Sequence, residues 1–588
     1  MRRKIAFLLT YYSFWILFFV VGKVIFLAYA HTQTTQLSLA DISKIFLYGL
    51  RLDASFAAYI SLLPFLLYVF ADHYQTFYVR FLRTYTWLVI ALIVLVHTAD
   101  LEIFRAWGSH LNSTPLLYLS SPSEVMASAG SSPLLLIFSI FVAWLMAVYW
   151  FFNKIVAPHE RIYFSKNPHW LGKFLLLFAT ALLVIPLRGG LQQIPINQSV
   201  SYFSDNNFAN QAAVNVAWNL MHSLTSQNHS QNPYNYFALA DAQKTVADLY
   251  AKKSTEKSAK WLKNNRPNVL LIIWESATAK IIAPLGGKPD VTPQFNALCN
   301  EGILFTNFYA SGDRSDKGLV SLLSGFPAQP TSSIIKTPHK TAKLPHLSRD
   351  FKANGYKTAF YYGGEPEFAN MRSFLHNGGF EQIIGKNDFE AKDWNSKWGA
   401  HDHVVFNKML QDINQRTENE QPFFYTLFTL SSHEPFEVPN QTAKATNEEG
   451  LFLNAHRYAD QSIGEFIAAA KKQAWWQNTL VIIVADHGHR LPNESVNHVP
   501  EKFTIPMLWL GGALAANPQQ ITQYGNQTDL ATTLLKQLNI SPKIPYLWSK
   551  DMADSSAASF AFYAFSDGLG WANEQGKFSI DNTSKNVI

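Results

Sequence analysis

The first third of the chain is dominated by long apolar runs, whereas the remainder alternates short apolar runs with polar stretches. Five runs are long and apolar enough to predict membrane-spanning helices. They cover residues 5–22, 54–71, about 84–98, 133–152 and about 170–187. The first run follows three basic residues but stays apolar as far as Ala30, which is longer than the core of a signal peptide. We therefore expect it to be retained as an anchor.

Basic residues are unevenly divided among the segments that flank these runs. They gather at the amino end, between the second and third runs, and between the fourth and fifth: Arg2, Arg3, Lys4, Arg80, Arg83, Lys154, Arg161, Lys166 and Lys173. The positive-inside rule assigns these segments to the cytoplasm. Five spans that start inside end outside, so we expect the rest of the chain to be extracytoplasmic.

Several charged and histidine residues lie at the predicted outer ends of the second and third spans. They are Arg51, Asp53, His97, Asp100 and Glu102. Ionisable residues at such depths either mark a path for a lipid headgroup or reach the interface by snorkelling. The sequence leaves both interpretations open.

The second half of the chain has the pattern of an α/β domain. Its short apolar runs, separated by helical stretches, are NVLLIIW, YKTAFYY, PFFYTLF, NTLVIIVA and TIPMLWL. Strands that are apolar on both faces indicate a mostly parallel sheet. We therefore expect a five-helix transmembrane bundle over 1–188, a basic amphipathic linker over 189–266 and an α/β domain over 267–588.

Composition narrows the functional classes. Hydrophobic residues make up 48% of the chain and charged residues only 15%, as expected for a part-membrane protein. The net charge of +6, from 48 basic and 42 acidic residues, is too small in so long a chain to indicate nucleic-acid binding. The single cysteine, Cys299, excludes an intramolecular disulfide and a Cys-based zinc cluster.

Candidate catalytic groups follow the predicted strands. Glu275 comes directly after NVLLIIW, Asp486 and His487 come after NTLVIIVA, and His433 follows PFFYTLF closely. In open α/β sheets ligands bind beyond the carboxyl ends of the strands. Carboxylates with one imidazole suit Mn²⁺, Mg²⁺ or Zn²⁺, and three protein ligands leave a position open for substrate. We predict a metal site at this edge.

Ser315 is the candidate nucleophile. It lies between Arg314 and Lys317 at a predicted helix start, where free N–H groups favour a phosphate oxyanion. A metal would lower the pKa of its hydroxyl. The alternative interpretation is that Ser315 only caps the helix.

These motifs together resemble the alkaline phosphatase and sulfatase superfamily, and the whole chain resembles the lipoteichoic acid synthase type of phosphoglycerol transferase. The matching segments are Trp274-Glu275-Ser276, Arg314 to Gly318, Trp398-Gly399 with Asp402, Ser432 to Phe436, and Ala485 to Gly488. The resemblance implies a Mn²⁺-like ion, with Mg²⁺ or Zn²⁺ as alternatives, on Glu275, Ser315, Asp486 and His487. It also implies that Ser315 takes the phosphoryl group and that His433 binds phosphate or protonates the leaving group.

The resemblance further implies a substrate site formed by Arg314, Lys317, Arg372, Trp398, Asp402 and His433. Two parts of this pattern depart from the family. Relatives more often have Thr as the nucleophile, where this chain has Ser315. Where relatives have Phe-His-Gly-Asn and then Trp-Asn-Arg, this chain has Tyr361 to Gly364 and then Ala369 to Arg372. Three further residues after the Asp-His pair either contact phosphate or a second metal, or lie on a solvated loop: His489, Arg490 and His498.

The implied function is transfer of glycerol phosphate from phosphatidylglycerol to a hydroxyl of a glycan or polymer, in the bacterial inner membrane with the catalytic domain outside. A phosphodiesterase would use water instead. A phosphoethanolamine transferase is an alternative, although that branch is normally rich in disulfides. A silent membrane scaffold would be expected to have lost a metal ligand. A sulfatase needs a C/S-x-P-x-R frame, which Ser315 lacks.

Overall fold

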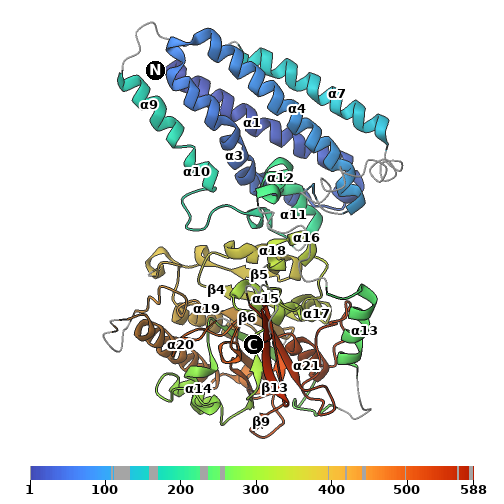
Figure 1. The fold of residues 1–588 in the computed structure, drawn as a ribbon, viewed down its shortest axis with the longest axis vertical. Helices are drawn as coiled ribbons and strands as arrows, with labels where there is room; N and C mark the ends of the chain where they lie inside the picture. Colours follow the sequence, from blue (N-terminus) through green and yellow to red (C-terminus); the bar gives the residue numbers. More distant parts are fainter. Residues whose placement is uncertain are drawn as a thin grey trace. The chain divides into compact units, whose positions relative to one another are not determined.

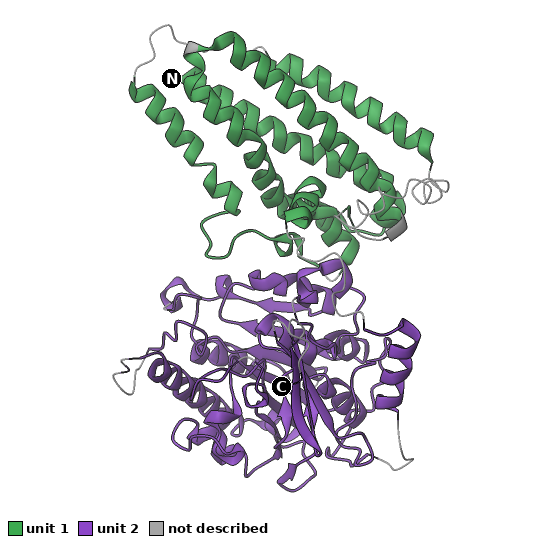
Figure 2. Ribbon diagram, in the orientation of Figure 1, with its two compact units in different colours: residues 1–233 green, residues 234–588 purple. Residues whose placement is uncertain are grey.

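The computed structural model of the chain divides into two compact units, residues 1–233 and residues 234–588 (Figure 2). The structure describes residues 2–107, 110–111, 133–157, 170–204, 206–225, 236–251, 258–330, 332–394, 396–417, 420–439, 445, 447–496, 498–565, 568–581 and 587. Arg161 and Lys166 lie outside these ranges.

The first unit is helical (Figure 1). Its longer helices are α1 Arg2–Tyr29, α3 Leu39–Phe70, α4 Gln75–Trp107, α7 Leu134–Phe151, α9 Trp170–Ala181, α10 Val184–Arg188, α11 Asn207–Ala213 and α12 Val216–Thr225. Among the described residues, five helical stretches are long and apolar enough to span a bilayer, the last being α9 together with α10. The five predicted spans are therefore confirmed as helices, in keeping with a membrane protein.

Two of these helices extend well beyond their uncharged runs. α3 begins at Leu39 rather than near residue 54, with Ser38 accepting a hydrogen bond from the backbone N–H of Asp41 as its N-cap. α4 begins at Gln75 rather than near residue 84. An uncharged run marks only the apolar middle of a helix, because charged residues near its ends are compatible with helical structure.

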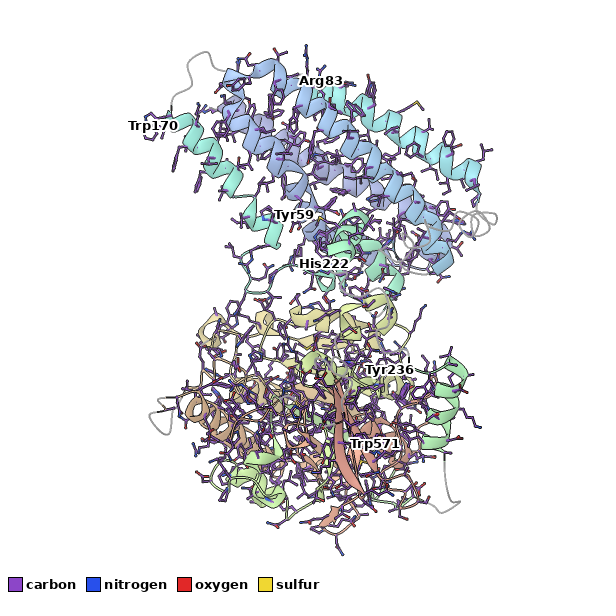
Figure 3. The ribbon with its side chains drawn as sticks, in the orientation of Figure 1. Tyr59, Arg83, Trp170, His222, Tyr236 and Trp571 are labelled. Atoms are coloured by element: carbon purple, nitrogen blue, oxygen red, sulfur yellow. The ribbon has the colours of Figure 1, made fainter. Side chains whose placement is uncertain are left out.

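The outer faces of the helical unit are apolar. Trp170 is 79% exposed, and its side chain projects from the first turn of α9 (Figure 3). Phe174 and Phe178, on the same helix, are more than half exposed. Large apolar side chains that face outwards in this number are typical of lipid-facing helices.

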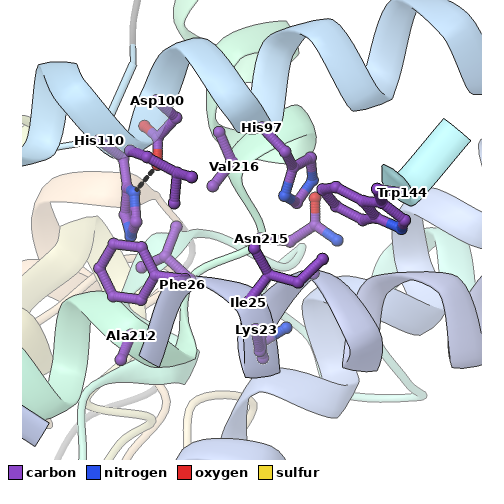
Figure 4. A pocket seen from close by; sticks show the side chains of 13 residues that line it. Lys23, Ile25, Phe26, His97, Asp100, His110, Trp144, Ala212, Asn215 and Val216 are labelled. Atoms are coloured by element: carbon purple, nitrogen blue, oxygen red, sulfur yellow. Dashed lines mark hydrogen bonds and ion pairs between the residues drawn. The ribbon is translucent and has the colours of Figure 1, made fainter. Parts of the chain in front are cut away.

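Two charged residues of the spans, Lys23 and Asp53, are buried inside the helical unit rather than snorkelling. Lys23 of α1 forms an ion pair with Asp53 of α3, and both side chains are at most 4% exposed. The side-chain amide of Asn215 donates a second hydrogen bond to Asp53 Oδ1 at 2.9 Å. Figure 4 shows Lys23, His97 and Asn215 around one narrow pocket. The snorkelling interpretation is therefore wrong for Asp53 and His97.

A second buried pair lies beside the same pocket. Asp100 Oδ2 is 2.7 Å from His110 Nδ1, a contact drawn in Figure 4, and His110 Nε2 donates to the carbonyl oxygen of Gln211 at 2.8 Å. Gln211 belongs to α11, so this pair and the Asn215 contact both fasten the chain after the fifth span to the helical bundle. Asp100 is 1% exposed, so its side chain is buried in the protein and does not snorkel to the membrane–water interface.

The segment expected to be a single linker, 189–266, is divided between the units. Its first part contains α11 and α12, which contact α3 and α4 respectively. Its later part contains α13 Leu239–Tyr250, whose Tyr250 ring packs against Phe560 of the second unit at 5.4 Å. The polar composition that suggested a linker reflects buried Asn and Gln side chains that hydrogen-bond within the first unit.

The second unit is built on an eight-stranded sheet with the order β5-β4-β6-β1-β7-β8-β2-β9. The strands are β1 Asn268–Trp274, β2 Ile303–Phe305, β4 Lys357–Tyr362, β5 Gln382–Ile384, β6 Phe423–Phe428, β7 Thr479–Ala485, β8 Met507–Leu510 and β9 Gln519–Ile521. The run from β5 to β7 is parallel, whereas β8 is antiparallel to both of its neighbours. The predicted mostly parallel α/β sheet is confirmed.

Helices and two smaller sheets complete this unit. The helices of six or more residues after α13 are α14 Pro293–Leu298, α15 Ser315–Ser324, α17 Leu347–Ala353, α18 Met371–Gly378, α19 Asp402–Asn414, α20 Glu448–Ala470 and α21 Asp529–Gln537. The small sheets are formed by β3 Phe308–Tyr309 with β10 Gly525–Asn526, and by β11 Phe560–Phe565, β12 Gly568–Asn573 and β13 Gly576–Asp581. β1 lies between β6 and β7, so their carboxyl ends meet at one edge.

The Lys23–Asp53 pair gives a stability prediction for the helical unit. Lys23→Met leaves a buried carboxylate without its cation, so we expect the detergent-solubilised protein to lose about 3–5 kcal/mol of unfolding free energy. The double variant Lys23→Met/Asp53→Leu should recover most of this loss, because it removes both charges. Lys44→Met, at an exposed position of α3, is the matched control for thermal unfolding. Equal stability of Lys23→Met and the control would contradict the assignment.

Candidate metal and phosphoryl-transfer site

Glu275, the residue after β1, is fixed by the end of the neighbouring strand. Its backbone N–H donates to Thr429 Oγ1 at 2.9 Å, and its carbonyl oxygen accepts from Ser432 Oγ at 2.7 Å. The hydroxyl of Ser276 donates to Glu275 Oε1 at 2.7 Å. These contacts hold a carboxylate that is only 3% exposed.

Asp486 and His487 follow β7 on the other side of β1. Asp486 Oδ1 accepts from the backbone N–H groups of Ser276 and His487, each at 2.8 Å, while Oδ2 has no hydrogen-bond partner among the described residues. His487 donates its Nδ1–H to the carbonyl oxygen of Gly488 at 2.8 Å. This bond leaves Nε2 facing Ser315 and the two carboxylates, the orientation that metal-ligating histidines have.

Ser315 is the first residue of α15 and faces these groups. Its Oγ lies 3.1 Å from Glu275 Oε2 and 3.4 Å from His487 Nε2. Gly318, one turn into the helix, permits this approach, because a Cβ there would lie 1.8 Å from the carbonyl oxygen of Asp486. The helix start and the strand end are therefore in direct backbone contact.

The donor atoms of Glu275, Asp486 and His487 all lie within 4.8 Å of one another. Burial and then the charge of Glu275 raise the pKa of Asp486 to about 7. Burial opposes ionisation of Glu275 and His487 as well. However, their mutual attraction lowers the pKa of Glu275 below its usual value and, with Asp486, raises that of His487 to about 10. Two buried carboxylates lie close together here, and Asp486 Oδ2 has no hydrogen bond among the described residues. A divalent cation at this position would offset their negative charge.

His433 lies on the loop after β6, where Ser432 contacts Glu275. Its Nδ1–H donates to the carbonyl oxygen of Glu434 at 2.8 Å, and its ring meets the Trp398 ring edge-on at 4.7 Å. Trp398 Nε1 donates to the same Glu434 carbonyl at 2.7 Å. Asp402 Oδ1, fully buried, accepts from the backbone N–H groups of Leu430 at 2.7 Å and Ser431 at 3.1 Å. Trp398 and Asp402 thus support the loop that carries His433.

The other predicted substrate residues lie in different surroundings. Arg314 is exposed, directly before Ser315. Lys317 is buried and donates to Asp313 Oδ1 at 2.9 Å and to the carbonyl oxygen of Pro330 at 3.0 Å. Arg372 forms an ion pair with Glu367 at 3.0 Å. Lys317 and Arg372 therefore each have a carboxylate partner in the protein itself.

Gln527 is a supporting residue that the sequence did not single out. Its side-chain amide donates to the carbonyl oxygens of Ala485 at 2.8 Å and Asp486 at 2.7 Å, and its Oε1 accepts from the backbone N–H of Ser311 at 2.9 Å. One buried side chain thus joins the segment that precedes Ser315 to the end of β7. A glutamine in a turn carries no local signal of such a role.

Known proteins resemble this chain in sequence and in fold. Residues 267–540 match the sulfatase family. Phosphoglycerol transferase I of Xanthomonas euvesicatoria is 28% identical over 269 residues, which are 42% of this chain and 38% of that protein. The lipoteichoic acid synthase-like protein YvgJ of Bacillus subtilis is 21% identical over 323 residues, 50% of this chain and 51% of the relative. The matches thus span about half or less of these relatives.

A solved structure shares the fold of the second unit. It is a protein of the alkaline phosphatase superfamily from Vibrio parahaemolyticus, 25% identical, with a TM-score of 0.52. The match covers 60% of this chain and 91% of that one. Residues 267–540 therefore match the sulfatase family and share the α/β fold of an alkaline phosphatase superfamily protein, in a chain similar to phosphoglycerol transferase I and a lipoteichoic acid synthase-like protein.

Proposed function

We propose that the protein transfers glycerol phosphate from phosphatidylglycerol to a hydroxyl of a glycan or polymer, with Ser315 as the covalent nucleophile. The observation that carries this proposal is the hydroxyl of Ser315 at 3.1 Å from Glu275, beside Asp486 and His487. The name phosphoglycerol transferase of one group of relatives supports phosphoglycerol as the transferred group, and the apolar helices would keep the enzyme beside a lipid donor. A silent scaffold would be expected to lack at least one of these four residues.

Glu275, Ser315, Asp486 and His487 would hold the metal ion. Asp486 Oδ2 has no hydrogen bond among the described residues, and His487 Nε2 faces both carboxylates. These buried groups fit one divalent cation. Mn²⁺ suits this mixture of carboxylate, hydroxyl and imidazole ligands, and Mg²⁺ or Zn²⁺ are the alternatives. When bound, such an ion supplies positive charge that favours the alkoxide form of a serine hydroxyl.

The residues of the chain account for the rest of the reaction. Glu275 Oε2 accepts the hydrogen bond of the Ser315 hydroxyl and so directs its proton away from the attacking lone pair. Attack forms the Oγ–P bond and breaks the bond from phosphorus to the diacylglycerol oxygen, which must gain a proton. His433 can deliver that proton from Nε2, because its Nδ1–H is held by Glu434. The acceptor hydroxyl then attacks phosphorus, returns a proton to His433 and releases Ser315, which takes back from Glu275 the proton that it gave up at the first attack.

The first prediction concerns the donor and the nucleophile. Purified enzyme in vesicles should release diacylglycerol from fluorescent phosphatidylglycerol but not from phosphatidylethanolamine. Ser315→Ala should lower the rate by about 10⁴ or more, since a covalent nucleophile is lost, while metal content stays unchanged. Release from phosphatidylethanolamine instead would favour the phosphoethanolamine transferase alternative.

The metal gives a separate prediction. Chelation by EDTA should abolish diacylglycerol release, and Mn²⁺ should restore it. Asp486→Asn should lower the bound metal measured by elemental analysis, whereas Asp460→Asn, a buried aspartate that caps α14, should retain it. Full activity in excess chelator, or metal retained in Asp486→Asn, would be incompatible with the proposed site.

His433 is predicted to act as the proton donor. His433→Ala should slow release of diacylglycerol by roughly 10² to 10⁴, the range that general acid catalysis supplies. A nitrophenyl phosphodiester has a better leaving group, needs the proton less and should recover much of the rate. Equal losses on both substrates would point to phosphate binding, and loss of metal would make His433 a ligand.

The orientation is proposed from the basic loops. An alkaline phosphatase fusion after residue 190 should be active, because that point is predicted to lie outside the cytoplasm of a bacterial inner membrane. A fusion near Ala157, next to Lys154, should be inactive. The reverse pattern of activities would show that the orientation is inverted.

A further inference from the structure

Two histidines on neighbouring loops carry their ring protons on opposite nitrogens. His433 donates from Nδ1 to a carbonyl oxygen, so its Nε2 is the unprotonated nitrogen of the neutral ring. His489 accepts a hydrogen bond at Nδ1 from the backbone N–H of Leu491 at 3.1 Å, so its proton lies on Nε2. The neutral His433 must therefore take up a proton at Nε2 before it can act as the proton donor, whereas the neutral His489 already carries a donor there.

The ring of His489 is held rigidly. It stacks on Phe452 at 4.5 Å with an interplanar angle of 16°, and the Phe436 ring meets it edge-on at 6.1 Å. His489 is two residues beyond His487, so the two Cα atoms are at most about 7 Å apart. The Nε2–H of His489 is thus a fixed donor close to the metal site.

Glu434 provides the complementary acceptor. Its carboxylate is 60% exposed, and Oε1 lies 3.9 Å from His489 Nε2, beyond hydrogen-bond distance. Its backbone is fixed by the bonds that Trp398 and His433 donate to its carbonyl oxygen. A single hydroxyl placed between the two groups would accept from the imidazole and donate to the carboxylate, which closes the 3.9 Å gap with two ordinary hydrogen bonds.

We propose that His489 and Glu434 bind a hydroxyl group of the glycerol headgroup and so favour it over a headgroup that lacks hydroxyls. This inference rests on the proposed function. A hydroxyl uses both a donor and an acceptor, whereas a bare alkyl chain uses neither. The negative charge of Glu434 disfavours a phosphate at this position.

The other polar residues of the same loop are engaged elsewhere. Arg490 forms ion pairs with Glu448 and Glu494. The backbone carbonyl of His498 accepts from the hydroxyls of Tyr563 at 3.0 Å and Ser579 at 2.6 Å, which fastens that part of the loop to the carboxy-terminal sheet. Of the three residues that the sequence analysis named after the Asp-His pair, His489 is the one whose Nε2 lies near the Glu434 carboxylate.

The experiment compares two lipids with the same acyl chains: phosphatidylglycerol and phosphatidylpropanol, which lacks both headgroup hydroxyls. Wild-type enzyme should have a higher kcat/KM for phosphatidylglycerol. His489→Phe keeps the stacking ring but removes the donor, and Glu434→Ala removes the acceptor. Each should lower kcat/KM for phosphatidylglycerol by about 10-fold, which corresponds to the loss of one hydrogen bond to a charged or buried group. The kcat/KM for phosphatidylpropanol should not change.

His489→Gln, whose amide N–H can replace the donor, should restore part of the preference, and His498→Phe on the same loop should retain all of it. Unchanged metal content in every variant separates headgroup binding from damage to His487. Equal rates on the two lipids in the wild type, or a preference that survives in both variants, would overturn this inference and leave the proposed function standing. Release of diacylglycerol from neither lipid would overturn both.

Discussion

The burial of two neighbouring carboxylates is the constraint on which the candidate site depends. Glu275 and Asp486 follow adjacent parallel strands, so the sheet itself brings them together and removes both from water. Burial, and then the charge of Glu275, raise the pKa of Asp486 to about 7. His487 and the start of α15 partly offset this charge, and a divalent cation would offset it fully. The surrounding hydrogen bonds keep the ligands in place against the repulsion between the two carboxylates.

Much of this site follows from the sequence because parallel strands place their carboxyl ends at a common edge. Glu275, Asp486, His487 and His433 each follow an apolar run, and β1 lies between β6 and β7 in the sheet. Residues that act through packing give no such signal. Gly318 matters because of the Asp486 carbonyl beside it, and that contact depends on how α15 docks against β7.

The helical unit shows the limits of hydropathy in a different way. Uncharged runs located all five spans but not the ends of α3 and α4, since these helices continue through charged residues. Hydropathy also does not predict the two buried pairs, which are Asp53 with Lys23 and Asp100 with His110. Those pairs explain why α11 and α12 belong to the helical unit despite their polar composition, because Gln211 and Asn215 satisfy buried charges there.

The central claim is that the phosphoryl group passes through the hydroxyl of Ser315. Its most direct test is mass spectrometry of enzyme quenched after brief incubation with phosphatidylglycerol in the absence of acceptor, followed by peptide mapping. The account predicts a glycerol phosphate adduct on the peptide that contains Ser315, at the Ser315 side chain. An adduct on another residue, or diacylglycerol release under the same conditions with no adduct at any quench time, would contradict it.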